Sequence, residues 1–251
     1  MEKNMQGSPL PRGEVPSACS INIEVLGQPD DATCGPTALH SVYRYYNDDI
    51  SLEQVIREVH KFEDGGTLAV WLGAHALSRG YEALLYTCNL QLLDPSWFAS
   101  PGVNMVQKLQ EQLEYKHEDK LVRTSLAFID FIQKGGKIRL EDVTRELLRR
   151  WLSRGYPILT GLSSTFLYRS SREVPPSQVL DDVQGLPAGH FVILCGYDRR
   201  NKTVTVADPL TQNPYSSTRK YNVHIDRVLC SILLGVLTYD ANFLIIKPRQ
   251  R

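Results

Sequence analysis

The residues best suited to chemistry lie around Cys34, in the run QPDDATCGP that begins at Gln28. Cys34 stands where a turn passes into a predicted helix, and a helix N-terminus offers unpaired N–H groups and a partial positive charge. Both features favour the thiolate, which is the nucleophilic form of cysteine. The pattern therefore indicates a nucleophile. The structural alternative is a small core residue, because cysteine is among the most buried residue types.

Two neighbours of Cys34 fit the same chemistry. Gln28 lies six residues before it, and its side-chain N–H could join the backbone N–H of Cys34 in holding the oxyanion of a tetrahedral intermediate. Gly35 removes a side chain beside the sulfur, which we expect to let a substrate carbonyl approach. We therefore predict Gln28 as part of the catalytic site and Gly35 as a substrate-binding position.

A histidine, His190, leads an apolar strand with the sequence HFVIL. A second apolar run at residues 203–207 follows a turn centred on residues 199–200, so the two runs predict a hairpin. Facing residues then have numbers that add up to about 399, which places His190 within about one residue of Asp208. A carboxylate there could orient the imidazole and stabilise its charged form. The structural alternatives are a histidine at a strand edge and an aspartate that caps the turn before Pro209.

The elements before residue 155 are predicted to be mostly helical. Thr33 and Ser51 are predicted N-cap residues, and Gln54 completes a capping box with Ser51. Apolar spacing and glycine stops predict helices over residues 34–46, 51–60, 68–79 and 141–154, and a strand over residues 81–88. Most of the stretch between residues 95 and 155 is predicted to be helical.

Strands dominate the prediction after residue 155, and they are expected over residues 156–162, 191–196, 203–207 and 243–246. The polar stretch 163–189 contains three prolines and is predicted to be a long loop or lid. Helices first and strands later indicate an α+β protein with a helical lobe over about residues 21–155 and a sheet lobe over about residues 156–251. Together the lobes form one catalytic domain, preceded by a flexible leader at residues 1–20.

The composition of the chain argues against several classes of partner and site. The 251 residues hold 28 Lys plus Arg and 28 Asp plus Glu, and no long basic block, so no nucleic-acid or anionic-membrane partner is expected. The apolar stretch 228–237 is shorter than the roughly 20 residues that cross a bilayer, and the N-terminus has no apolar run typical of a secretory signal. Five cysteines without a CxxC pair argue against disulfides and metal sites. We therefore predict a cytoplasmic protein without metal or cofactor.

Four short motifs follow one another in the sequence: Gln28 to Leu39, Gly155-Tyr156-Pro157-Ile158, Gly189-His190-Phe191-Val192 and Ala207-Asp208-Pro209. They resemble the papain-like cysteine peptidases that trim double-glycine leaders from bacteriocins, and the order of the candidate residues Gln, Cys, His and Asp matches as well. The resemblance covers about residues 22–248 and implies a papain-like α+β fold. It further implies Cys34 as nucleophile, His190 as its base and Asp208 as the partner of the histidine. Gln28 would stabilise the oxyanion and Gly189 would be a substrate-binding position.

The sequence also departs from that family. Thr33 stands where members usually carry an acidic or amide residue, and residues 94–137 and 163–189 extend the compact core. Leader peptidases are usually fused to a transporter, yet no membrane segment or GxxxxGK[ST] phosphate loop is present here. The resemblance thus implies the fold and a cysteine peptidase acting on a peptide or protein, with the leader-trimming role left open. An acyltransferase or amidase using the same residues, or a catalytically idle peptide-binding domain, remain alternatives, and the oligomeric state is open.

Overall fold

The computed structural model describes residues 16–63, 65–175, 177–238 and 241–249. In this part of the chain eight strands form one sheet. They are β1 (Ala18–Ser20), β2 (Tyr81–Thr87), β3 (Lys137–Arg139), β4 (Ile158–Ser163), β7 (Gly189–Asp198), β8 (Thr203–Ala207), β9 (Lys220–His224) and β10 (Asn242–Pro248). The strand order is β3-β2-β10-β4-β7-β8-β9, and β1 pairs with β7. The short strands β5 (Glu173–Val174) and β6 (Val179–Leu180) pair separately.

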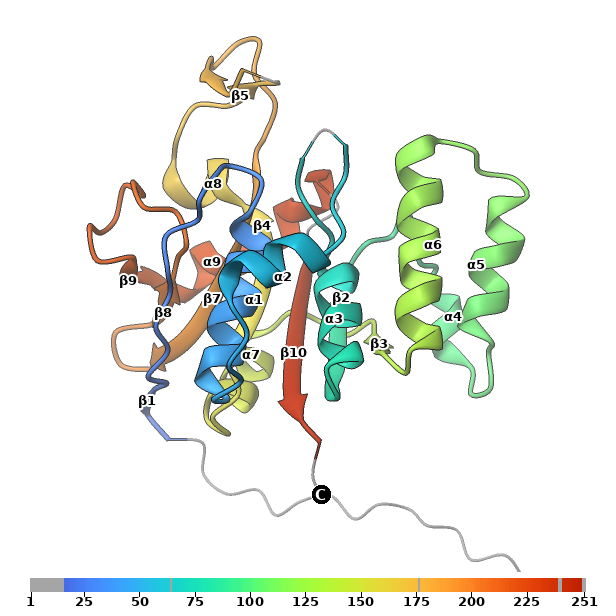
Figure 1. Cartoon of the computed structure of the whole chain (residues 1–251), viewed down its shortest axis with the longest axis horizontal. Helices are drawn as coiled ribbons and strands as arrows, with labels where there is room; N and C mark the ends of the chain where they lie inside the picture. The colour runs from blue at the N-terminus through green and yellow to red at the C-terminus, as the bar shows by residue number, and fades with distance from the viewer. Residues whose placement is uncertain (1–15, 64, 176, 239–240, 250–251) are drawn as a thin grey trace, which may run out of the picture.

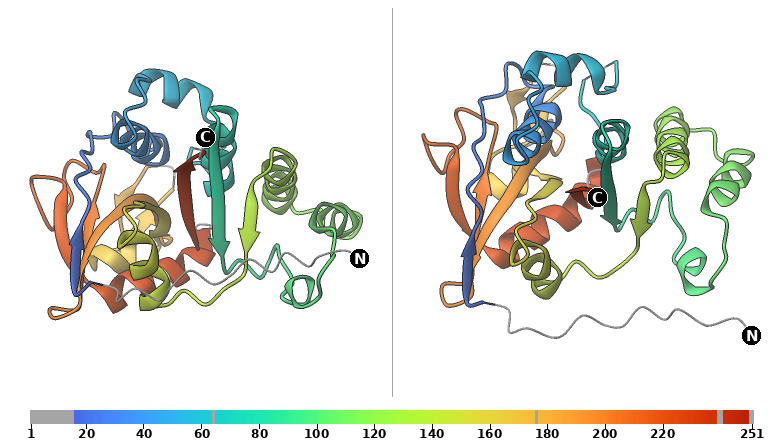
Figure 2. Two further views of the ribbon diagram at one scale, coloured as in Figure 1. Left: turned by 90° about the horizontal axis from the view of Figure 1, so that it is seen from below. Right: turned by 60° about the horizontal axis from the view of Figure 1, so that its bottom comes forward.

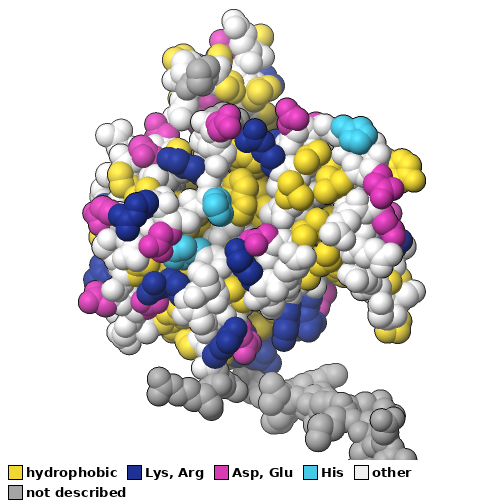
Figure 3. Space-filling model, turned by 45° about the vertical axis from the view of Figure 1, so that its right-hand side comes forward, with side chains coloured by type: hydrophobic (Ala, Val, Ile, Leu, Met, Phe, Trp, Pro, Cys, Tyr) yellow, Lys and Arg dark blue, Asp and Glu magenta, His cyan; other side chains and the backbone are white. Residues whose placement is uncertain are grey.

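The helices are α1 (Cys34–Tyr45), α2 (Leu52–Glu58), α3 (Ala69–Ser78), α4 (Ser96–Ala99), α5 (Met105–Leu113), α6 (Asp119–Gln133), α7 (Arg145–Leu152), α8 (Ser164–Tyr168), α9 (Ile225–Leu234) and the 3-10 helix η1 (Gly235–Thr238). Helices α1 to α3 cover one face of the sheet, and α7 and α9 cover the other (Figures 1 and 2). Helices α4 to α6 form a group beside β3, at one edge of the molecule (Figure 1). Several hydrophobic side chains are exposed on the part of the surface that adjoins this group (Figure 3). The predicted α+β class is confirmed.

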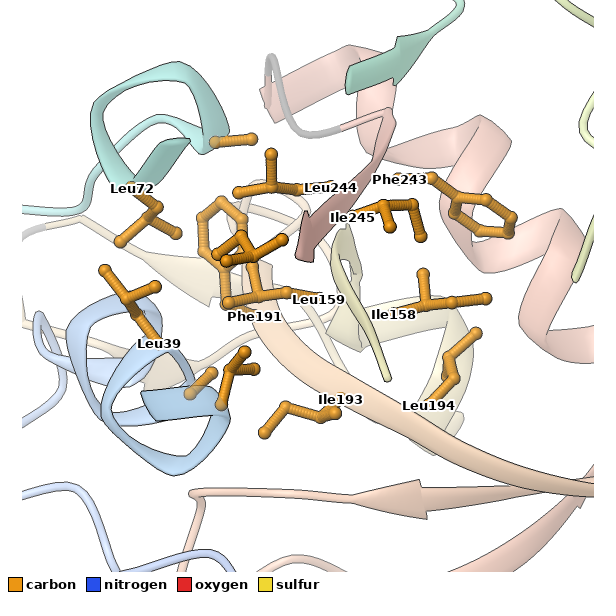
Figure 4. Close-up of a cluster of buried hydrophobic side chains, with 14 of the residues drawn as sticks. Leu39, Leu72, Ile158, Leu159, Phe191, Ile193, Leu194, Phe243, Leu244 and Ile245 are labelled. Carbon is orange, nitrogen blue, oxygen red and sulfur yellow. The ribbon is translucent and has the colours of Figure 1, made fainter. Parts of the chain in front are cut away.

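The core fills both sides of the central strands (Figure 4). Leu39 of α1 and Leu72 of α3 are fully buried against one face. By the strand register, the residues on that face are Leu159, Phe191, Ile193 and Leu244, and those on the opposite face are Ile158, Leu194, Phe243 and Ile245. Burial on both faces explains why these strands are near-continuous apolar runs instead of alternating ones.

Helices and strands are not segregated at residue 155. Strand β10, from the end of the chain, pairs antiparallel with β2 on one side and with β4 on the other. The sheet thereby takes strands from both halves of the sequence, and α8 and α9 belong to the second half. Pairing between distant segments leaves no trace in local periodicity, which is why the sequence predicted two separate lobes.

The last residues of the predicted flexible leader, residues 1–20, form a strand in the structure. Residues 1–15 lie outside the described part of the chain, but Ala18–Ser20 forms β1, with Ala18 opposite Asp198 and Ser20 opposite Gly196. Strand β4 pairs with residues 189–194 of β7, and β1 pairs with residues 196–198 of the same strand. Strand β1 therefore provides hydrogen-bond partners for the backbone of β7 beyond the end of β4. No helix among the described residues has the length and apolar character needed to span a membrane.

The predicted loop or lid contains regular structure. Helix α8 opens it, and the following residues 169–175 and 177–188, here called the arm, carry β5 and β6 and rise beyond the end of the sheet (Figure 1). A bridge between Glu173 and Leu186 closes the base of the arm. Helix α1 and strand β7 both begin at this end of the molecule, so the arm stands above the candidate site (Figure 1).

Candidate active site

Cys34 is the first residue of α1 and is 8% exposed. The predicted side-chain cap by Thr33 is wrong: its hydroxyl donates to the carbonyl oxygen of Asp30 at 3.0 Å and accepts the Asp30 N–H at 3.3 Å. The turn before α1 has therefore engaged the hydroxyl that would have capped the helix. Without that cap, N–H groups of the first turn stay available to a negative charge at Cys34.

His190 and Asp208 lie in direct contact, where β7 begins and β8 has just ended. The Nε2–H of His190 donates to Oδ1 of Asp208 at 2.8 Å, and the carboxylate is fully buried. The hairpin register differs from the prediction by two residues next to the turn, where Asp198 faces Thr203, and by one residue beyond the bulge between Leu194 and Gly196. The shift is small enough that the two side chains still meet.

Opposing effects set the protonation of this pair. Burial lowers the pKa of His190, but the charge and hydrogen bond of Asp208, together with the Cys34 side chain as a hydrogen-bond partner and charge, raise the pKa to about 10. Burial raises the pKa of Asp208, but His190 and two tyrosine hydroxyls lower it below its ordinary value. At neutral pH the pair is therefore an imidazolium and a carboxylate, with the Cys34 side chain as the third partner.

Gln28 reaches the same end of the sheet. Its backbone N–H donates to the carbonyl oxygen of Pro209 at 2.9 Å, which ties the loop before α1 to the segment after Asp208. Its Nε2 donates to the carbonyl oxygen of Asp30 at 2.9 Å, whereas Oε1 is buried without a hydrogen-bond partner. The amide is thus near the site, but in this orientation one of its N–H groups is used by a neighbouring carbonyl.

The two glycines have different surroundings. A Cβ on Gly35 would lie 2.4 Å from Cγ2 of Thr67 and 3.3 Å from the ring of Phe191, so the missing side chain lets α1 pack closely. This is a different reason for the glycine from the expected approach of a carbonyl. Gly189 is exposed and pairs with Ser163, which leaves the backbone next to His190 open to solvent.

Comparison with known proteins identifies the family. A model described as the Peptidase_C39 like family matches residues 20–228, a range that contains Cys34, His190 and Asp208. The chain belongs to this family. The resemblance drawn from the four motifs is thereby confirmed at the family level. No curated protein matches the sequence.

Several solved structures resemble this C39-like chain. A double glycine motif protease from an AMS/PCAT transporter, in complex with its leader peptide, shares 16% identity over 92% of this chain and 95% of that one, with a TM-score of 0.45. A putative C39-like peptidase from Bacillus anthracis shares 13% identity over 93% and 99%, with a TM-score of 0.48. Xylellain, a cysteine protease from Xylella fastidiosa, shares 16% over 97% and 91%, with a TM-score of 0.46.

Two tyrosines that the sequence did not single out bind the Asp208 carboxylate. The hydroxyls of Tyr168 and Tyr221 donate to Oδ2 of Asp208 at 2.5 and 2.6 Å, and the backbone N–H of Leu210 donates to Oδ1 at 2.9 Å. Tyr168 ends α8 and Tyr221 lies in β9, an element that was not predicted. The alternation of apolar Tyr221 and Val223 with polar residues on either side was the available signal for that strand.

We expect Tyr168→Phe to slow the alkylation of Cys34 about tenfold, the size of one charge-assisted hydrogen bond. Losing a donor raises the pKa of Asp208 and weakens its hold on the His190 imidazolium. The second-order rate constant for alkylation of Cys34, measured from pH 6 to pH 10 in steps of about one pH unit, tests this prediction. Tyr215→Phe is the matched control, since Tyr215 packs on Tyr221 but donates to the carbonyl oxygen of Leu167. Equal rates in the two variants would leave Tyr168 without a role in positioning Asp208.

Proposed function

We propose that this chain is a cysteine peptidase that cleaves a peptide or amide bond through a thioester on Cys34. The observation that carries the proposal is the buried His190–Asp208 ion pair, with the Cys34 side chain as its third partner. Membership of the Peptidase_C39 like family supports the same activity. Helix α1 supplies the positive N-terminus that favours a thiolate at its first residue.

The proposed reaction follows from which ring nitrogen Asp208 occupies. Asp208 accepts from Nε2, which leaves Nδ1 of His190 for the thiol. The Cys34 thiolate attacks the carbonyl carbon and forms a C–S bond, and the imidazolium gives its proton to the leaving amine as the C–N bond breaks. Neutral His190 then takes a proton from water, which attacks the thioester and releases Cys34. Asp208 stabilises the imidazolium throughout and is not itself protonated.

Gln28 is proposed to contribute to the oxyanion hole together with the backbone N–H of Cys34. Its unpartnered, buried Oε1 supports a change of orientation when substrate binds. A buried acceptor without a donor costs about 1–3 kcal/mol. A half-turn of the amide would break the Nε2 hydrogen bond to Asp30, and a new hydrogen bond from Nε2 to the charged oxyanion would offset that loss.

A peptide-library digest with a labelled amine in excess tests the proposal. The library includes double-glycine peptides because the motifs resemble those of leader peptidases. A peptidase gives products with new free carboxyl termini that depend on Cys34, read by mass spectrometry. Products carrying the amine, without hydrolysis, would assign the site to acyl transfer. Saturable peptide binding without any turnover, equal in wild type and Cys34→Ala, would make the chain an idle binding domain.

A further inference from the structure

A pocket of about 400 Å³ lies between α8, α9, η1 and residues of the arm. Helix α9 packs on β4 behind the sheet, whereas α1 and Cys34 lie in front (Figures 1 and 2). The pocket therefore lies on the α9 side of the sheet, and its Ser163 pairs with Gly189, the residue before His190. Its lining residues are Ser163, Thr165, Phe166, Arg169, Arg172, Pro187, Arg227, Leu234 and Leu237.

One part of the lining is apolar and uncovered. Phe166 and Leu234 are each 38% exposed, and Leu237 is 63% exposed. These side chains come from α8, α9 and η1 and are apolar residues of the same pocket lining. An apolar chain of a ligand would gain free energy by covering them, at about 25 cal/mol for each Å² removed from water.

The other part of the lining is cationic. Arg227 donates to the carbonyl oxygen of Phe166 at 2.7 Å and lies 4.9 Å from the centre of its ring. Arg172 donates to the carbonyl oxygens of Asp182 and Val183. These partners are neutral, so they fix the two guanidinium groups without cancelling their charge.

No carboxylate pairs with these arginines in the described part of the chain. None of its ion pairs within 4.0 Å includes Arg169, Arg172 or Arg227. Asp181 feels the charge of Arg172, but its exposed carboxylate accepts the N–H groups of residues 183 and 184. The pocket therefore complements an anion.

The two hydroxyls in the lining each accept one backbone N–H, and a hydroxyl also has one O–H that it can donate to an anion. The Ser163 hydroxyl accepts the N–H of Phe166 at 3.3 Å, and the Thr165 hydroxyl accepts the N–H of Ala188 at 2.9 Å. A peptide terminus would bring its own N–H and C=O groups, which need hydrogen-bond partners when buried. An alkyl carboxylate brings one anionic group and an apolar chain, and so fits this lining better.

We propose that this pocket binds a carboxylate on an unbranched alkyl chain, a ligand of the fatty-acid class. The carboxylate is held by Arg169 and Arg172, and the chain lies along Phe166, Leu234 and Leu237. The volume is typical of a small-molecule site. This proposal rests on the pocket alone and does not depend on the peptidase activity.

Titration calorimetry with decanoate, kept below its micelle concentration, tests the pocket. We expect saturable 1:1 binding, at least about tenfold tighter than that of decanol or acetate, because only decanoate has both parts. Arg169→Gln should weaken it about tenfold. The control Arg57→Gln, an exposed position on α2 at the front of the sheet, should not. Binding should be unchanged in Cys34→Ser, which separates this test from that of the peptidase proposal.

Three results would overturn the assignment. Equal affinity for decanol and decanoate would mean that the arginines do not select an anion. Wild-type affinity in Arg169→Gln, with the fold checked by circular dichroism, would place decanoate elsewhere. Tighter binding of an acetylated dileucine with a free carboxylate would assign the pocket to a peptide C-terminus instead.

Discussion

Replacing Cys34 with serine is expected to reduce peptide cleavage about 10⁴-fold or more, because removing a nucleophile abolishes covalent catalysis and leaves only binding effects. Serine is nearly isosteric with cysteine, so the fold should be retained even though Cys34 is only 8% exposed. Single-turnover cleavage of any peptide found in the library digest, quantified by mass spectrometry, measures the loss.

Cys230→Ser is the control for this loss, since Cys230 is exposed on α9, on the far side of the sheet. Its cleavage rate should stay within about twofold of wild type, as for most surface substitutions. Cleavage that survives in Cys34→Ser at a similar level would mean that the nucleophile lies elsewhere.

Asp208→Asn is expected to lower kcat/KM by about 10²–10⁴-fold, the range for losing the acid that orients a catalytic histidine. Asp208 is the main cause of the raised pKa of His190, and burial acts in the opposite direction. Without the carboxylate, burial lowers this pKa and the Cys34 side chain alone still raises it, so the pKa of His190 should fall. NMR titration of ¹⁵N-labelled histidine should show His190 titrating near pH 10 in wild type and at a clearly lower pH in the variant.

The difference in the free energy of unfolding between wild type and Asp208→Asn should depend on pH. The raised pKa of His190 contributes stability that is complete below pH 6.5 and is lost as the pH rises toward about 10. The lowered pKa of Asp208 contributes stability above its usual 3.8 that is lost as the pH falls further. The gap in unfolding free energy should therefore be widest between those limits and narrow toward pH 10. A gap that stays constant from pH 6 to pH 10, about four pH units, would contradict a charged His190.

Local signals in the sequence were sufficient for the hairpin that brings His190 to Asp208. A short turn between two apolar runs fixes which residues face each other, and the bulge after Leu194 shifted the register without separating the pair. The N-cap at Ser51 was equally local, and its hydroxyl accepts the N–H of Gln54 as predicted. The Gln54 side chain, which would have formed the other half of the capping box, donates to Glu58 instead.

Contacts between distant segments account for what the sequence did not predict. Tyr168 and Tyr221 donate hydrogen bonds to Asp208. Tyr168 lies on α8, the helix before the arm, and Tyr221 lies on β9, a strand that was not predicted. Neither residue belongs to a motif. The central place of β10 likewise depends on pairing with β2, more than 150 residues earlier. Thr33 failed as a cap because Asp30, three residues before it, bonds its hydroxyl instead.

The relative reactivity of the five cysteines toward iodoacetamide tests the nucleophilic role of Cys34 most directly. Exposure alone predicts that Cys230 reacts first, because it is exposed whereas Cys34 is buried. An active Cys34 should react fastest in peptide mapping despite its burial, and should slow about 100-fold in His190→Ala while Cys230 is unchanged. Labelling that follows exposure, with Cys34 indifferent to the loss of His190, would contradict the proposed chemistry.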